Sequence, residues 1–168
     1  MLTEPKLEQR KAQPYVGIRS RVTAQELGTV LPPLSDEVYA WLKKKGVEPS
    51  GPPFWRYLIV DMEKKLEIDV GLPVASAIPG DGRILADILP AGRYATAVHT
   101  GHPDELEGAT AALLDWAEKR GIEWWLDGER WAGRIEWYLS DPAAEPDMHK
   151  WKTELAFLTL DHMAAEAK

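Results

Sequence analysis

The order of predicted elements repeats within the chain, and this repeat constrains the fold more than any other feature of the sequence. β-rich segments bounded by Pro and Gly turns predict strand, strand, helix, strand and strand over residues 6–74, and the same order over residues 84–160. Tyr15 and Tyr94 follow equivalent turns in the two halves. We therefore expect an α+β fold of two pseudo-symmetric units, side by side, with antiparallel sheets.

The two halves of the sequence also agree at the ends of their predicted elements. Each predicted helix stops at a glycine, Gly46 or Gly121, the residue that most often ends a helix. The fourth strand begins Leu66-Glu67-Ile68 in one half and Thr153-Glu154-Leu155 in the other. This alignment predicts that Glu67 occupies the place of Glu154.

Two segments carry apolar residues at helical spacing. The first runs from Thr23 to Lys45, and Pro32-Pro33 interrupts it, so we expect the main helix to begin near these prolines. The second runs from about Pro103 to Arg120.

Composition excludes several classes of protein. The 168 residues suit a single domain, 1–168, and the absence of Cys excludes a disulfide scaffold or a thiolate site. A net charge of -7 argues against direct binding to nucleic acid, which needs a basic surface. No apolar run is long enough to span a bilayer, and no secretory signal is visible, so we expect a cytoplasmic protein without membrane contact.

Strand parity predicts one polar wall. Alternate side chains of a strand point to opposite faces of its sheet. We expect the apolar residues Ile135, Trp137 and Leu139 to pack under a helix, which leaves Glu136 and Tyr138 on the other face. Leu155 and Phe157 place Glu154 opposite a helix in the same way. If the two strands form a hairpin, Glu136, Tyr138 and Glu154 lie together on one wall. The alternative interpretation is that both glutamates lie on the solvent-facing side of the sheet.

Several motifs, in order along the chain, resemble the GyrI-like family, also known as AraC-type effector-binding domains. The segments that carry the resemblance are Gly51–Phe54, Leu66–Val74, Leu89–Ala95, Glu136–Pro142 and Lys152–Leu158. Members of this family serve as the drug-sensing halves of multidrug regulators. No helix-turn-helix motif accompanies these segments, so we expect any regulator to be assembled with another chain.

The resemblance implies a cleft between the two halves that binds bulky, flat, hydrophobic or cationic molecules around buried glutamates. Eight Trp residues in a chain of this size support an aromatic site. The face presented by Trp55, Arg56 and Tyr57 stays open, because both parities carry bulky groups. The residues expected to bind ligand are Glu136, Tyr138, Glu154, Glu67, Trp55, Tyr57, Trp125 and Trp131.

Three functions are compatible with these residues. The first is binding of a small molecule for sensing or sequestration. The second is hydrolysis of cyclopropane-containing DNA-alkylating compounds, an activity of some stand-alone family members, with Glu154 and Tyr138 as catalytic groups. The third is an interaction with a protein partner, either a regulator or DNA gyrase.

Neither a metal nor a cofactor is expected. His99 and His102 have a spacing that suits metal ligands, but no third ligand is evident nearby, and Asp104 fits better as a cap of the following helix. The sequence also lacks a glycine-rich phosphate-binding loop and a nucleophile elbow.

Overall fold

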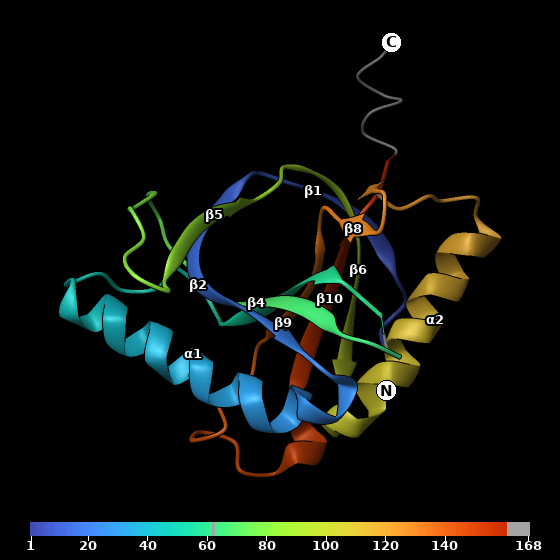
Figure 1. Ribbon diagram of the computed structural model, residues 1–168. Coiled ribbons are helices and arrows are strands. Elements are labelled where there is room, and N and C mark those ends of the chain that lie inside the picture. The colour runs from blue at the N-terminus through green and yellow to red at the C-terminus, as the bar shows by residue number, and fades with distance from the viewer. Residues whose placement is uncertain (62, 161–168) are drawn as a thin grey trace.

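The computed structural model describes residues 1–61 and 63–160. Ten strands, two α-helices and three short 3-10 helices follow one another along this part of the chain (Figure 1). In order, they are β1 (Lys6–Arg10), β2 (Gln13–Val22), η1 (Ala24–Glu26), α1 (Leu27–Lys44), β3 (Phe54–Ile59), β4 (Leu66–Pro73), β5 (Leu85–Leu89), β6 (Gly92–Thr100), η2 (Pro103–Glu105), α2 (Leu106–Lys119), β7 (Leu126–Asp127), β8 (Arg130–Trp131), β9 (Arg134–Tyr138), η3 (Met148–Lys150) and β10 (Lys152–Leu158).

Eight strands form one antiparallel sheet in the order β1-β6-β10-β9-β3-β4-β2-β5, which curls into a half-barrel. The predicted α+β repeat is confirmed, with β2, α1, β3 and β4 answering β6, α2, β9 and β10. The two halves join where β3 pairs with β9. The outer strands are exchanged, because β1 pairs with β6 of the second half and β5 pairs with β2 of the first.

The pairing registers define which residues are equivalent. Tyr15 of β2 lies opposite Pro73, and Tyr94 of β6 lies opposite Leu158. Asp69 lies four residues before Pro73 on β4, and Glu154 lies four residues before Leu158 on β10, so Asp69 is the equivalent of Glu154. The predicted match between Glu67 and Glu154 is therefore wrong by two residues, because similar strand beginnings do not fix the pairing register.

Helix α1 begins earlier than the prolines predict. Thr23 and Glu26 form a capping box that starts η1, and α1 continues directly from Leu27. Pro32 and Pro33 lie inside α1 on its exposed side, where water can satisfy the carbonyl groups that lose their backbone partners. The second helix agrees with its prediction.

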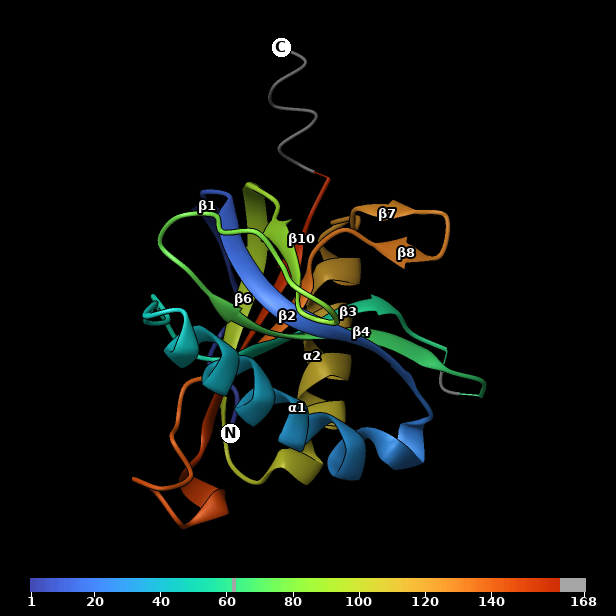
Figure 2. The same ribbon diagram turned by 60° about the vertical axis from the view of Figure 1, so that its left-hand side comes forward.

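Both helices pack on the same face of the sheet, α1 on β2 and β4 and α2 on β6 (Figure 2). The opposite, open face has its own apolar cluster, in which Tyr15, Phe54 and Tyr94 are buried. Burial on both faces means that an apolar residue is not necessarily on the helix face. Among the described residues, no helix is both long and apolar enough to cross a membrane.

Candidate functional site

Glu136 and Glu154 lie on opposite faces of the sheet. Directly paired residues of adjacent strands share a face, and Glu136 pairs with Leu155, which packs under α2. Glu154 pairs instead with Trp137, on the open face. The prediction that Glu136, Tyr138 and Glu154 form one wall is therefore wrong.

The error lies in the assignment of Trp137. Its ring packs against Phe54, with 4.8 Å between centroids, in the apolar cluster of the open face. Leu139, which was expected under a helix, follows the end of β9 and is 46 % exposed. The alternating apolar residues of this strand therefore pack in the open-face core and not under a helix.

The helix face of the central strands carries a polar and aromatic group of side chains, which we call the Glu136 cluster. It consists of Trp55 and Tyr57 from β3 and of Arg134, Glu136 and Tyr138 from β9. Tyr138 donates a hydrogen bond of 2.6 Å to Glu136 Oε1, and Tyr57 donates one of 3.0 Å to the same oxygen. The ring of Trp55 meets that of Tyr138 edge-on at 5.3 Å. The sequence left the face of Trp55, Arg56 and Tyr57 undecided. In the structure Trp55 and Tyr57 lie on the helix face, and Arg56 lies on the open face.

The Glu136 carboxylate is held in a desolvated position, with only 8 % of the residue exposed. Within residues 1–61 and 63–160, no Lys or Arg nitrogen lies within 4.0 Å of it. Burial raises the pKa of Glu136, and the two tyrosine hydroxyls and the charge of Arg134 only partly oppose this rise. Burial and the adjacent carboxylate also raise the pKa values of Tyr57 and Tyr138, so both stay protonated donors.

Arg134, which sequence reasoning missed, lies among aromatic rings at the side of this cluster. Its guanidinium carbon is 4.6 Å from the ring centroid of Trp131, 5.1 Å from that of Phe157 and 5.9 Å from that of Tyr57. Its position two residues before Glu136 is the signal that could have identified it, because such residues share a face.

The Trp-rich segment forms the β7–β8 hairpin and reaches both faces. Trp131 packs against Phe157 on the helix face, whereas Trp125 packs against the open-face core. Arg130 of the hairpin forms an ion pair of 2.7 Å with Glu67 of the first half. The hairpin therefore ties the two halves together, and of its two predicted ligand residues only Trp131 adjoins the Glu136 cluster.

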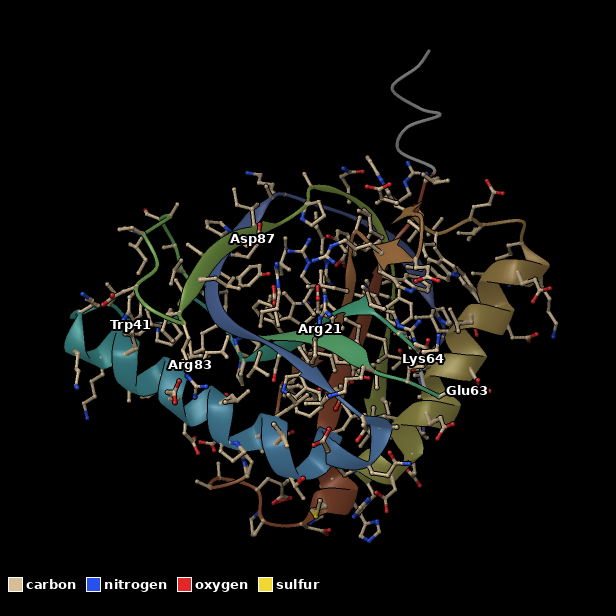
Figure 3. The ribbon with its side chains drawn as sticks, viewed as in Figure 1. Arg21, Trp41, Glu63, Lys64, Arg83 and Asp87 are labelled. Atoms are coloured by element: carbon tan, nitrogen blue, oxygen red, sulfur yellow. The ribbon has the colours of Figure 1, made fainter. Side chains whose placement is uncertain are left out.

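The predicted site residues of the open face are paired with arginines. Glu154 contacts Arg10 at 2.8 Å, and Glu67 contacts Arg21 at 3.1 Å as well as the hairpin arginine. Burial alone would raise the pKa of Glu67, but the two arginines lower it. Arg21 lies near the end of β2 in Figure 3.

Asp69, the equivalent of Glu154, is completely buried on the same face. Arg19 donates to it through two nitrogens, at 2.8 and 3.0 Å, and the hydroxyl of Tyr15 donates as well. Arg56 donates to Tyr15 at 3.0 Å and to the carbonyl of Ala132 at 2.9 Å. This network compensates its charges internally, as expected of a structural role.

A cavity of about 290 Å³ lies at the end of the open face. Glu154, Trp137 and Arg10 line it together with the Gly51-Pro52 turn. Glu154 forms an ion pair here with Arg10, which also contacts Glu8 at 2.6 Å, so the carboxylate of Glu154, unlike that of Glu136, has a contacting cation among the described residues.

The histidine pair has structural contacts. The Nε2 atom of His99 lies 3.1 Å from Glu105, and Nδ1 of His102 accepts a hydrogen bond from the backbone of Asp104. The cap of η2 is therefore His102 rather than the predicted Asp104. Across the described residues, no group of three or more His, Cys, Asp or Glu side chains could hold a metal ion.

Known structures share this architecture over nearly the whole chain. The crystal structure of the EcmrR C-terminal domain has a TM-score of 0.77 at 21 % identity, covering 93 % of this chain and 96 % of that one. In the EcmrR–DNA complex the TM-score is 0.78 at 22 % identity, covering 93 % of this chain, which spans only 57 % of the EcmrR chain.

Two further structures are similar at lower identity. SAV2435 bound to tetraphenylphosphonium has a TM-score of 0.60 at 13 % identity, with 94 % of both chains covered. A hydrolase from Listeria innocua has a TM-score of 0.66 at 16 % identity, covering 93 % of this chain and 91 % of that one. No curated protein matches the sequence.

The curled antiparallel sheet with two helices on one face is the architecture that these structures share. The model of the GyrI-like small molecule binding domain matches residues 3–158. The chain belongs to the GyrI-like family, as its sequence motifs imply.

Proposed function

We propose that the Glu136 cluster is the ligand site of this domain and that it binds bulky, flat, hydrophobic molecules. The observation that carries the proposal is a buried carboxylate that no cation of the described residues contacts. Keeping such a charge out of water costs several kcal/mol, and a ligand that uses the charge offsets that cost. Trp55, Tyr57 and Tyr138 supply ring faces and edges for stacking, worth about 0.5–1.5 kcal/mol for each aromatic pair.

The arrangement of the helices supports this location. Helices α1 and α2 pack on the strands to either side, β2 and β4 for one and β6 for the other. The central strands β3 and β9, which carry the cluster, therefore lie between them. The similarity to SAV2435, which is bound to tetraphenylphosphonium, agrees with a site for a bulky aromatic compound.

A titration with the flat, zwitterionic dye rhodamine B tests the site. Glu136→Gln and Trp55→Ala should each weaken binding at least about tenfold, which corresponds to about 1.4 kcal/mol. Glu154→Gln is the matched control, because it removes the same charge on the opposite face. Fluorescence anisotropy measures the affinity, and equal affinities in Glu136→Gln and Glu154→Gln would overturn the proposal.

We propose hydrolysis of a cyclopropane-containing compound as a second candidate function. The raised pKa of Glu136 favours it, because a carboxylate of raised basicity is a better acceptor for a proton from water. In a cyclopropane fused to a conjugated dienone, water would add its oxygen to a cyclopropane carbon as the strained carbon–carbon bond breaks, and the electrons of that bond would pass to the dienone carbonyl oxygen, which becomes a phenolate. Glu136 would take the proton from water, and the hydroxyl of Tyr138, which donates to Glu136 in the structure, would then turn to donate to the phenolate.

This assignment replaces Glu154, which lies on the other face from Tyr138. The similar Listeria innocua hydrolase makes the test worthwhile. Incubation with a reactive cyclopropanoid, followed by chromatography, should show product for the parent and Glu154→Gln. Glu136→Gln and Tyr138→Phe should lose turnover at least about a hundredfold, the usual contribution of a general acid or base. Unchanged turnover in Glu136→Gln would exclude this role.

A further inference from the structure

Arg134 places a positive charge inside the ligand site proposed above. It is the first residue of β9 and pairs with Phe157 of β10. Three aromatic rings lie within 6 Å of its guanidinium carbon, the range of cation–π interactions. These rings hold the guanidinium by their faces.

The guanidinium has no direct counter-ion among the described residues. In the part of the chain that the structure describes, no carboxylate oxygen lies within 4.0 Å of the guanidinium nitrogens of Arg134, and none of its side-chain N–H groups donates a hydrogen bond to a protein acceptor. An arginine side chain has five N–H donors and stays charged in proteins. The donors of Arg134 are therefore open to a ligand.

Arg134 and Glu136 are the two charged residues of the Glu136 cluster. They are two residues apart on one face of β9, so their Cα atoms are roughly 7 Å apart. Burial lowers the pKa of Arg134, and the nearby Glu136 and Tyr57 oppose this. A cation that stacks on Trp55 or Tyr138 beside Glu136 is also repelled by Arg134, whereas a dipolar ligand satisfies both charges.

We propose that Arg134 is a specificity-determining residue, which makes the Glu136 cluster select aromatic ligands that are neutral or zwitterionic and carry a hydrogen-bond acceptor. The acceptor, such as a phosphoryl or carbonyl oxygen, binds the guanidinium, and the rings of the ligand stack on Trp55 and Tyr138. Simple organic cations bind more weakly. This inference rests on the proposed ligand site and adds the charge class of its ligand.

Two compounds of similar bulk separate the effect of charge from that of shape. Tetraphenylphosphonium is a cation without an acceptor, and triphenylphosphine oxide is neutral with a strong acceptor. In calorimetric titrations, the parent should bind the phosphine oxide more tightly than the cation. In Arg134→Gln, the ratio of the two affinities should move toward the cation by at least about tenfold, because a positive charge that repels the cation has been removed.

Two further variants define the cause. Arg134→Lys keeps the charge and should keep the parent's preference for the phosphine oxide. If Arg134→Lys loses this preference, the charge of Arg134 does not determine the selection. Arg120→Gln removes an arginine at the C-cap of α2 that stacks on Trp116 at 4.5 Å and not on any of the three rings around Arg134, and it should leave both affinities unchanged.

The outcomes distinguish this inference from the proposed function. If both compounds bind to the cluster but Arg134→Gln leaves their ratio unchanged, the charge selection is wrong and the site stands. If neither compound binds to the parent or to any variant, the site and the selection fail together.

Discussion

The hydrogen bond from Tyr138 to Glu136 gives the most direct test of the electrostatics of the site. Tyr138→Phe removes one hydroxyl, 2.6 Å from a buried carboxylate oxygen, and leaves the hydroxyl of Tyr57 on the same oxygen. A hydrogen bond to a charged group contributes about 1.5–3 kcal/mol, and one between neutral groups about 0.5–1.5 kcal/mol. The cost of the substitution therefore depends on whether Glu136 is ionised.

The pH dependence follows from the raised pKa of Glu136. A carboxyl group whose pKa is raised by folding stabilises the fold fully below its unfolded value, about 4.3, and loses this contribution as the pH rises through the folded value. Tyr138→Phe raises the pKa of Glu136 further, because the lost bond favoured the ionised form. The variant should lose about 0.5–1.5 kcal/mol of unfolding free energy at low pH and about 1.5–3 kcal/mol in the alkaline range.

Urea denaturation of the parent and Tyr138→Phe across this pH range measures the difference. Carbon-13 NMR of the Glu136 carboxyl group reports its pKa directly. Tyr57→Phe, whose bond is 3.0 Å long, should show the same trend with a smaller amplitude. A stability difference for Tyr138→Phe that is independent of pH, with an unchanged pKa of Glu136, would refute this account.

Two substitutions test the packing and charge pairing of the open face. Gly71→Ala places a Cβ atom 2.6 Å from the Phe54 ring, and this overpacking should cost about 1–3 kcal/mol in urea denaturation. A parent-like midpoint would show that the ring moves aside freely. Asp69→Asn weakens charge-assisted bonds from Arg19 at a completely buried position, so we expect a loss of at least about 1.5 kcal/mol in the same assay. An unchanged stability of Asp69→Asn would contradict the structural role of that network.

The sequence predicts the order of elements well, because turns and helix ends are local signals. Gly46 and Gly121 both adopt positive φ angles, 72° and 68°, immediately after the C-caps of the two helices. The capping box at Thr23 is equally local, and it sets the start of the first helical region ahead of the two prolines.

The faces of the strands are harder to predict. The rule that apolar residues lie under a helix works for Leu155 and Phe157 but fails for Trp137, because the curled sheet buries apolar groups on both faces. Cross-strand pairing decides the face of Glu136, and pairing is a property of the whole sheet. The pairing of Glu154 with Arg10 depends in turn on an exchanged strand that no local pattern indicates.

The exchanged strands make the two halves interdependent during synthesis and folding. Strand β1 is made first, yet its partner β6 follows more than 80 residues later, so β1 must wait unpaired until the second half emerges. Strand β5 closes the first half only after the whole of that half has been made. The outermost strand of each half's sheet comes from the other half. If the chain is cut between the halves, the first half therefore loses β5 and the second half loses β1. The duplicated unit has thus become a single folding unit, whose slow step should be long-range strand pairing.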